Sequence, residues 1–263
     1  MKRGSFRFLL VGSPVGHSLS PLMHAAAMDA AGITGTYEVL DTGPEGLERT
    51  VEALRVGELQ GVNVTMPLKD AAFRLADEVT PEARCARAVN SLRFRGGKIE
   101  GHSTDVSAMS AITRSRCHQV TEALVLGGGG AARAVLCALG DVTTYVSARD
   151  RTQAESAAAV APGTSQLPWG SGVAGAMVVN ATPLGMGGED LPGTPVSAAG
   201  CLVDLSYASG ETPAMARARR SGIPVVDGVE FLSLAAAASL AWWTGAHVDS
   251  AVMLEAARNT QDL

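Results

Sequence analysis

The segment Ala123-Leu124-Val125-Leu126-Gly127-Gly128-Gly129-Gly130-Ala131-Ala132-Arg133-Ala134 joins an apolar run to four glycines and then to residues that favour a helix. Glycines let the backbone turn tightly and approach a pyrophosphate, and the start of a helix offers N–H groups and the positive end of a dipole. Gly127, Gly129 and Ala132 fit the spacing G-x-G-x-x-A. With a strand before it, a helix after it and a further strand at 142–147, this spacing predicts a dinucleotide-binding turn. The alternative is a turn with a structural role only.

The residues after the expected strand at 142–147 indicate which dinucleotide binds. Enzymes that use NAD place an acidic residue there for the ribose 2′-hydroxyl, whereas enzymes that use NADP place cations there for the 2′-phosphate. Arg149 can stack on the adenine and pair with the phosphate through two hydrogen bonds. The neighbouring Asp150 gives the opposite signal, and both charges would also suit a solvated loop. We favour NADP as the cofactor and keep NAD as the alternative.

Segments of strand and helix character alternate along the chain on both sides of this turn. The first series ends with a hairpin at 91–101, and near Asp105 the alternation begins again. Alternating strands and helices predict layered α/β domains, and a chain of 263 residues is long enough for two. We therefore expect an N-terminal α/β domain at 1–105 and a Rossmann-like dinucleotide-binding domain at 106–231. The expected strands are 7–11, 36–40, 61–66, 123–126, 142–147, 177–180, 201–205 and 224–226. The expected helices are 21–31, 46–56, 71–76, one that begins near Asp105, 131–139, 152–160, 213–221 and the tail after 230.

The composition excludes several other classes of protein. Apolar residues make up 46 % of the chain and charged residues 18 %, which is typical of a globular rather than a disordered chain. The net charge of −5 argues against general nucleic-acid binding, which needs a basic surface. No metal site is predicted, because no CxxC pair is formed by the four cysteines, Cys85, Cys117, Cys137 and Cys201.

No segment predicts a signal peptide or a membrane span. The apolar run at 8–11 is too short for the core of a signal peptide. The stretch at 231–248 lacks Asp, Glu, Lys and Arg, but it is rich in Ala and Ser, so we expect a buried helix there. We therefore expect a cytoplasmic protein that binds neither nucleic acids nor membranes. We further expect it to bind small molecules and to be a monomer or a homodimer.

Polar residues gather at the ends of expected strands in three segments, 12–24, 63–69 and 101–105. In the first segment, the hydroxyl groups of Ser18 and Ser20 can point at one anionic or polyhydroxylated ligand. Ser20 would equally suit the N-cap of the helix that follows it.

Lys69 and Asp105 would make a proton-transfer pair for the reduction of a carbonyl group if the fold brought them together beside a dinucleotide. Lys69 would act as the acid or base, and Asp105 would hold it and support its charge. Spacing along the chain does not bring the two together, and a lone Lys after a strand is commonly a surface charge.

Taken together, these segments resemble the shikimate dehydrogenase family. The family pattern runs G-x-P-x-x-H-S-x-S-P-x-x-H, N-V-T-x-P-x-K, A-V-N-T, N-T-D, G-x-G-G-A-A-R-A, N-A-T-P-x-G-M, D-L-x-Y and D-G-x-x-M-L. The corresponding segments occur in the same order over almost the whole chain, and they are Gly12–His24, Asn63–Lys69, Ala88–Ser91, Ser103–Asp105, Gly127–Ala134, Asn180–Met186, Asp204–Tyr207 and Asp227–Leu232.

The resemblance implies an NADP-dependent oxidoreductase that reversibly reduces 3-dehydroshikimate to shikimate in the biosynthesis of aromatic amino acids. It also implies that the C-terminal helices at 232–263 return to the first domain, which would bind the substrate. Lys69 and Asp105 would be the catalytic pair, with no metal. The residues implied for the substrate are Ser18, Ser20, Thr65, Asn90 and Tyr207, with Asn63 supporting them, and those implied for the cofactor are Gly127, Gly128, Gly129, Gly130, Ala131, Arg149, Thr182, Leu205 and Gly228.

The sequence departs from the family pattern at a few positions. Ala235 stands where most members carry a Gln that hydrogen-bonds the substrate, and Ser103 replaces the Asn of N-T-D. Ala148 and Asp150 replace the Asn and Thr on either side of Arg149. These changes leave two alternatives. One is a family member with shifted specificity, for quinate or aminoshikimate or with NAD. The other is a catalytically weak dinucleotide-binding protein with a regulatory role.

Overall fold

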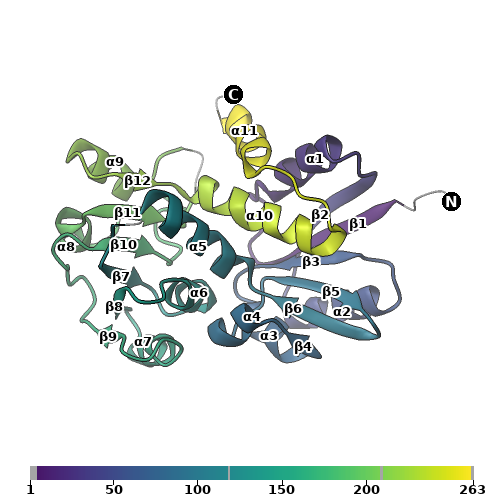
Figure 1. Ribbon diagram of the computed structural model, residues 1–263, viewed down its shortest axis with the longest axis horizontal. Helices are drawn as coiled ribbons and strands as arrows, with labels where there is room; N and C mark the ends of the chain where they lie inside the picture. The colour runs from purple at the N-terminus through teal and green to yellow at the C-terminus, as the bar shows by residue number, and fades with distance from the viewer. Residues whose placement is uncertain (1–4, 118, 208–209, 262–263) are drawn as a thin grey trace. The chain divides into compact units, whose positions relative to one another are not determined.

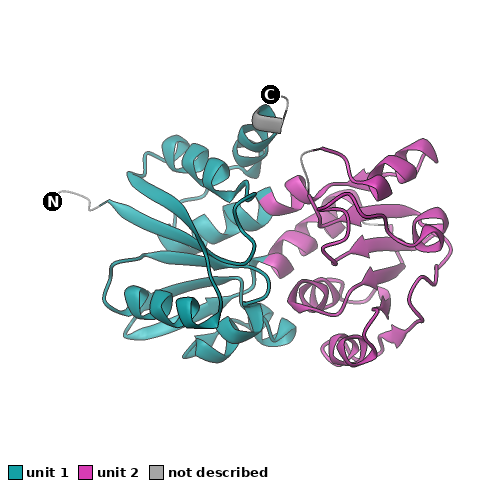
Figure 2. Cartoon of the chain, turned by 180° about the vertical axis from the view of Figure 1, so that it is seen from behind, with its two compact units in different colours: residues 1–104, 233–263 teal, residues 105–232 magenta. Residues whose placement is uncertain are grey.

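The computed structural model describes residues 5–117, 119–207 and 210–261 of the chain. The chain divides into two compact units, one formed by residues 1–104 and 233–263 and the other by residues 105–232 (Figure 2). Within the described residues, each unit contains one six-stranded sheet. The expectation of an α/β fold is therefore confirmed.

The first unit contains β1 (Phe6–Gly12), α1 (Ser20–Ala30), β2 (Gly35–Asp41), α2 (Pro44–Arg55), β3 (Gly61–Val64), α3 (Lys69–Leu75), β4 (Glu78–Val79), α4 (Pro81–Ala86), β5 (Ser91–Arg95), β6 (Lys98–His102), most of α10 (Gly228–Thr244) and α11 (Ser250–Gln261) (Figure 1). Its strands lie in the order β2-β1-β3-β5-β6-β4. β1 pairs in parallel with β2 and β3, whereas β5 pairs antiparallel with β3 and β6. The unit is therefore built on a mixed sheet.

The C-terminal helices complete the first unit. α11 packs against α1, and α10 places Trp243 against β1, where its ring stacks on Phe8 at a centroid distance of 4.9 Å. A Cβ atom at Gly61 of β3 would lie 2.3 Å from the Trp243 ring, so this glycine lets the helix approach the sheet. A second group of buried side chains forms the core around α2, and it includes Val11, Leu47, Leu54, Val62, Leu92 and Ile99.

The second unit contains α5 (Thr104–Arg116), β7 (Glu122–Leu126), α6 (Gly130–Ala138), β8 (Thr143–Ser147), α7 (Arg151–Ala158), β9 (Ser165–Gln166), β10 (Met177–Asn180), α8 (Gly193–Ala198), β11 (Cys201–Asp204), α9 (Pro213–Arg220) and β12 (Val225–Val226). All its strand pairs are parallel, and the order is β12-β11-β10-β7-β8-β9. Numbered within the unit, this is the 3-2-1-4-5-6 order of a Rossmann fold, read from the other edge.

Helices cover both faces of this parallel sheet. α6 contacts α7 and α8 contacts α9, and the two pairs lie on opposite sides of the strands (Figure 1). Strands that are covered on both faces read as continuous apolar runs. Leu124 and Leu126 of β7, Val178 of β10 and Leu202 of β11 are accordingly fully buried.

Sequence and structure differ mainly at short elements. α4 and α8 were not among the expected helices, because six residues are too few for a helical period to show. The strand expected at 61–66 ends at Val64, because Thr65 already begins a turn in which its carbonyl oxygen accepts from the N–H of Leu68. The helical tail is divided into α10 and α11. In the described part of the chain, no helix is long and apolar enough to cross a membrane.

Candidate functional site

The turn after β7 requires glycine at two positions. Gly127 has a φ of +116°, which side chains other than glycine rarely adopt, and a Cβ there would lie 2.9 Å from the carbonyl oxygen of Ala181. A Cβ at Gly128 would lie 2.6 Å from backbone atoms of Gln153. The turn is therefore held between the loop after β10 and the first turn of α7.

Gly129 and the start of α6 leave space for a ligand. Gly129 is the N-cap of α6, its backbone is extended, and no side chain caps the helix. A Cβ at Gly129 would meet no atom within 4 Å. Gly130 and Ala131 then form the first turn, whose N–H groups point out of the helix start. This open, positively polarised end fits the pyrophosphate of a dinucleotide.

The turn also lies where the order of the sheet reverses, because β7 pairs with β8 on one side and with β10 on the other. Ligands of open α/β sheets bind outside the carboxyl ends of the strands at such a point. Thr182 follows β10 there, and Leu205 follows β11, where its N–H donates to the carbonyl oxygen of Asn180 at 3.0 Å. A Cβ at Gly228 would lie 2.8 Å from the carbonyl oxygen of Leu205. The structure thus brings the predicted cofactor residues of these loops to one edge.

A buried carboxylate shapes this edge. Asp204 is fully buried and accepts hydrogen bonds from Asn180 Nδ2 at 2.7 Å, Thr212 Oγ1 at 2.7 Å and the N–H of Ser206 at 3.1 Å. Burial raises the pKa of Asp204, and the hydrogen bonds from Thr212 and Asn180 oppose this rise. Asn180 Oδ1 accepts from both the N–H and the hydroxyl of Thr182, at 3.0 and 2.7 Å. The network therefore orients the loop that carries Thr182.

Arg149 and Asp150 follow β8 and have different surroundings. Asp150 is the N-cap of α7, and its Oδ1 accepts a hydrogen bond from the N–H of Gln153 at 3.1 Å. Arg149 is exposed, whereas the next cation, Arg151, pairs with Glu155 of its own helix. The carboxylate of Asp150 therefore caps a helix, which accounts for an acidic residue at this position without any role in binding a ribose.

On the substrate side, Ser18 and Ser20 lie at the start of α1. Leu19 is the N-cap, Ser20 is the first helical residue, and the N–H of Ser20 donates to Ser18 Oγ at 3.2 Å. The alternative expectation that Ser20 caps α1 is therefore wrong, because the helix begins one residue earlier than the sequence indicates. Ser20 is buried and Ser18 is half-buried.

The loop that precedes these serines packs on the end of β3. The N–H of Ser13 donates to the carbonyl oxygen of Met66 at 2.9 Å. A Cβ at Gly12 would lie 2.3 Å from Cγ2 of Thr65, so only a glycine lets the two segments touch. The structure thus brings Thr65 beside the loop that follows β1 and leads to Ser18 and Ser20, as a shared binding site requires.

The amides of Asn63 and Asn90 belong to one hydrogen-bond network. Asn63 Nδ2 donates to the carbonyl oxygen of Asn90 at 3.1 Å and to Ser239 Oγ at 2.8 Å, and Asn63 Oδ1 accepts from the hydroxyl of Tyr37 at 2.8 Å. The N–H of Thr104 donates to Asn90 Oδ1 at 2.8 Å, and Thr104 Oγ1 lies 3.3 Å from Ser239 Oγ. Both N–H groups of Asn63 are used within the protein, which suits a residue that supports the site.

Sequence reasoning missed Tyr37 and Ser239 in this network. Ser239 is fully buried in α10, and its hydroxyl donates to the carbonyl oxygen of Ala235 at 3.1 Å. A hydroxyl in the alanine-rich tail was the available signal for Ser239. Tyr37 is an ordinary strand residue, and nothing in the sequence connects it with Asn63.

The network continues to a buried imidazole. His24 Nδ1 lies 3.0 Å from the carbonyl oxygen of Ser20, and the ring stacks on Tyr37 and Trp243 at centroid distances of 4.0 and 5.7 Å. Burial lowers the pKa of His24 to about 4, and the hydrogen bond to Ser20 only partly opposes this. His24 is therefore neutral at physiological pH.

Lys69 and Asp105 each begin a helix, in different units. Lys69 is the first residue of α3 and is half-buried, and its carbonyl oxygen accepts from the N–H of Val89 at 3.1 Å. Asp105 is buried in the first turn of α5, where the helix dipole stabilises a carboxylate. Tyr207 follows β11 in the second unit and is half-buried.

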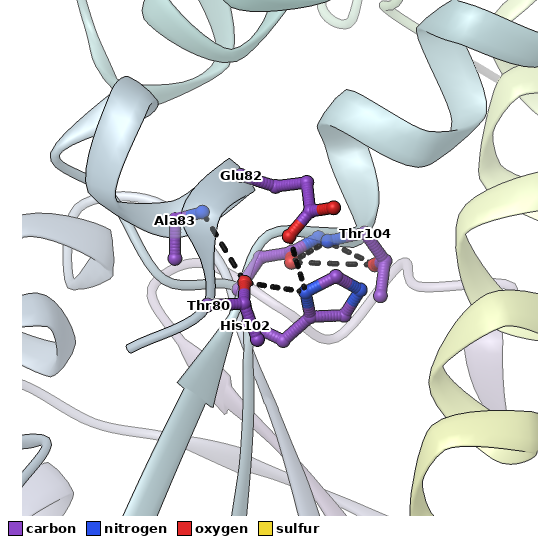
Figure 3. A network of polar contacts seen from close by, with 6 residues as sticks. Thr80, Glu82, Ala83, His102 and Thr104 are labelled. Carbon is purple, nitrogen blue, oxygen red and sulfur yellow. Dashed lines mark hydrogen bonds and ion pairs between the residues drawn. The ribbon is translucent and has the colours of Figure 1, made fainter. Parts of the chain in front are cut away.

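The strand that leads to Asp105 is held by His102. Nδ1 of His102 lies 2.8 Å from Thr80 Oγ1 and 3.8 Å from the carboxylate of Glu82 (Figure 3). Thr80 also caps α4 by accepting from the N–H of Ala83 at 3.4 Å. These contacts fix the end of β6, directly before the segment that enters α5.

A parallel sheet of this strand order, with a glycine turn and an uncapped helix start at its switch point, defines a dinucleotide-binding protein. The chain is 39 % identical over 263 aligned residues to the shikimate dehydrogenase (NADP(+)) of Methylobacterium radiotolerans, with 91 % of each chain covered. It is 37 % identical over 259 residues to the protein of the same name from Thermus thermophilus, covering 96 % of this chain and 97 % of that one. The chain belongs to the shikimate dehydrogenase family.

Domain and structure comparisons agree with this membership. The family model for the shikimate dehydrogenase substrate binding domain matches residues 10–92. Shikimate 5-dehydrogenase from Thermus thermophilus, in complex with NADP(H) and shikimate, is similar with a TM-score of 0.86 at 34 % identity, covering 97 % of this chain and 99 % of that one. The ligand-free 5-ketofructose reductase of a Gluconobacter strain is similar with a TM-score of 0.84 at 26 % identity, covering 98 % and 99 %. The resemblance based on the motifs is confirmed.

Proposed function

We propose that the protein is an NADP-dependent shikimate dehydrogenase, which reversibly reduces 3-dehydroshikimate to shikimate in the biosynthesis of aromatic amino acids. The observation that carries this proposal is the 39 % identity to a shikimate dehydrogenase (NADP(+)) over 91 % of both chains. In this proposal, residues 1–105 and the helices at 232–263 bind the substrate, and residues 106–231 bind the cofactor.

The cofactor side rests on the open backbone of the glycine turn. Gly127 to Ala131 would hold the pyrophosphate, and Arg149 would pair with the 2′-phosphate. Thr182, Leu205 and Gly228 would line the nicotinamide end at the same sheet edge. Among the described residues, no group of three or more His, Cys, Asp or Glu could hold a metal ion, and the proposed chemistry uses none.

The substrate side rests on hydroxyl and amide donors. Ser18, Ser20 and Thr65 would bind the carboxylate and hydroxyl groups of the ligand, together with Asn90 and Tyr207. Such donors can hold a small anion without an Arg. Asn63 would keep the site in shape, because its amide is bonded to Tyr37, Asn90 and Ser239.

Lys69 and Asp105 would move the proton. Bound NADPH supplies the hydride for the carbonyl carbon. The ammonium group of Lys69 would give a proton to the alkoxide oxygen, and in the reverse direction the neutral amine would take the proton back. The carboxylate of Asp105 would stabilise the ammonium form of Lys69.

The proposal is tested by following nicotinamide absorbance with shikimate and quinate, each with NADP⁺ and NAD⁺. We expect rapid turnover with shikimate and NADP⁺. Lys69→Ala should reduce kcat by about 10²–10⁴-fold, as expected for a lost general acid, and should retain most shikimate binding by calorimetry. An unchanged kcat would remove Lys69 from the mechanism, and cofactor binding without turnover would favour the regulatory alternative.

Ala235 favours a second candidate, a family member with shifted specificity. Ala235 is buried in α10, one helical turn before Ser239. Its methyl group cannot make the hydrogen bond of the usual Gln, and such a loss costs about 1–3 kcal/mol if the partner is left unpaired. Higher kcat/KM with quinate or aminoshikimate than with shikimate, or with NAD⁺ than with NADP⁺, would establish this candidate. Ala235→Gln should then move the preference toward shikimate.

The protein is further proposed to act in the cytoplasm, as a monomer or a homodimer. The net charge of −5 supports a protein that does not bind nucleic acid or anionic membranes. Cell fractionation tests the compartment, and sedimentation velocity over a range of concentrations distinguishes the two oligomeric states.

A further inference from the structure

Cys117 and Cys201 of the second unit are in contact, although they form no CxxC motif in the sequence. Sγ of Cys117 lies 3.7 Å from Sγ of Cys201, and the two residues are 84 positions apart in the chain. Both are free thiols. Cys117 directly follows α5 and Cys201 opens β11, so the pair joins the end of a helix to the start of a strand.

The surroundings shift the pKa values of the two thiols in opposite directions. The hydrogen bond between the two thiols lowers the pKa of Cys117, and burial opposes this. Of the nearby ion pair, Arg116 lowers the pKa of Cys117 and Glu230 raises it. The same contact, together with burial, raises the pKa of Cys201. Cys117 is therefore the thiol of the pair that loses its proton more readily. Cys117 is only 5 % exposed, whereas Cys201 is half-buried.

We propose that Cys117 and Cys201 form an oxidative modification site, at which a small peroxide converts the two thiols into a disulfide. The sulfurs are already in van der Waals contact at 3.7 Å, and a disulfide needs a separation of about 2.05 Å. The slight exposure of Cys117 selects a small oxidant over a bulky disulfide such as oxidised glutathione. The proposal does not depend on the enzymatic function.

The chemistry balances with one peroxide for each pair. The thiolate of Cys117 attacks one peroxide oxygen, the O–O bond breaks, and a sulfenic acid forms while hydroxide leaves and takes up a proton. The sulfur of Cys201 gives up its proton, attacks the sulfenic sulfur and displaces a second hydroxide, which becomes water. With hydrogen peroxide, two thiols are oxidised to one disulfide and the peroxide is reduced to two molecules of water.

The full chain is tested by treating reduced protein with a few equivalents of hydrogen peroxide, alkylating the remaining thiols and mapping non-reduced peptides by mass spectrometry. We expect a peptide pair linked through Cys117 and Cys201, which separates on addition of dithiothreitol. The thermal midpoint should rise on oxidation and fall again on reduction, because the bond closes a long span of chain.

Two variants make the test specific. Cys117→Ser and Cys201→Ser should both lose the linked peptide and show a smaller rise in thermal midpoint than the wild type, and Cys201→Ala serves if a serine is not tolerated. In Cys201→Ser, the sulfenic acid on Cys117 has no partner and should be trapped by dimedone. The proposal is overturned if peroxide leaves both thiols open to alkylation, or oxidises them separately to sulfonic acids with no linked peptide.

Discussion

The side-chain amide of Asn63 donates a hydrogen bond to the hydroxyl of Ser239 at 2.8 Å, across 176 positions of the chain. Ser239 Oγ also lies 3.3 Å from Thr104 Oγ1, and Thr104 Oγ1 accepts a hydrogen bond from Asn90 Nδ2 at 3.0 Å. One hydroxyl of α10 therefore orients both amides of the proposed substrate site. A change at Ser239 should consequently alter substrate binding although Ser239 itself is fully buried.

Ser239→Ala should raise KM for shikimate roughly tenfold and leave KM for NADP⁺ unchanged. The variant leaves an N–H of Asn63 without its acceptor, which costs about 1–3 kcal/mol, and 1.4 kcal/mol is a factor of ten. Steady-state kinetics with each substrate varied in turn measures the difference.

A matched control and a double variant accompany this measurement. Ser115→Ala in α5 loses the same kind of bond, from a hydroxyl to the carbonyl oxygen four residues earlier at 2.8 Å, but at an exposed position, and it should change neither KM. In an Asn63→Ala background, Ser239→Ala should have a smaller effect than it has alone, because part of its effect acts through the contact with Asn63. A full additional effect in that background would show that Ser239 does not act through Asn63.

Alanine substitutions at the neighbouring positions Gly128 and Gly129 should have different effects. Gly129→Ala meets no atom within 4 Å, so the thermal midpoint should stay unchanged while KM for NADP⁺ rises, because the new methyl group occupies the approach of the pyrophosphate. Gly128→Ala would place a Cβ 2.6 Å from the backbone of Gln153, so this variant should lose stability as well. Differential scanning calorimetry and cofactor titration separate the two effects. Equal stabilities would contradict the packing described for the turn.

Two variants of Asp150 can separate the effect of its charge on cofactor preference from the effect of its helix cap on stability. Asp150→Asn keeps an N-cap for α7 but removes a negative charge beside Arg149, so kcat/KM for NADP⁺ relative to NAD⁺ should increase. Asp150→Ala should show a similar change in preference and also lose about 1 kcal/mol of stability with the cap. The comparison uses both cofactors and urea unfolding. A selective loss of NAD⁺ activity in Asp150→Asn would instead mean that Asp150 binds the ribose.

We expect the buried His24 to lower the free energy of unfolding in acid. Its pKa is about 4 in the folded protein, against 6.5 for the ordinary side chain. Between these two values the unfolded chain binds a proton that the folded chain does not, so the free energy of unfolding falls as the pH decreases from 6.5 to about 4, and this group adds no further loss below that. The shift corresponds to about 3 kcal/mol.

Urea unfolding of the wild type and His24→Phe between pH 7 and pH 4 isolates this contribution. We expect the wild type to lose more stability than the variant over this range. If both proteins lose the same free energy of unfolding between pH 7 and pH 4, His24 is not responsible for the loss of stability in acid.

Local patterns in the sequence predicted the regular elements well. β10 begins and ends where it was expected, at 177–180, and β7 differs by one residue, because buried parallel strands are continuous apolar runs between clear turn residues. The glycine turn was predicted for the same reason, since its spacing and its flanking elements are all local. Family membership followed from eight motifs in order, and sequence comparison confirmed it.

Roles that depend on distant partners could not be predicted in this way. Asp150 reads equally well as a ribose ligand, and only the position of the Gln153 N–H shows it as a helix cap. Ser239 and Asn63 are joined by the packing of α10 on the first sheet, which no local pattern encodes. Ser20 illustrates the smaller error, because the first residue of a helix and its N-cap differ by one position and have similar preferences.

The packing of Trp243 on Phe8 and against Gly61 has a consequence for synthesis of the chain. Domains generally fold as they leave the ribosome, from the N-terminus onward. Here residues 105–232 emerge with every strand of their own sheet, while the first unit still lacks the helices at 233–263 that belong to it. The second unit can therefore complete its fold during synthesis before the first unit does. A chain released after residue 232 would contain the complete nucleotide-binding sheet, joined to a first sheet with an uncovered apolar face.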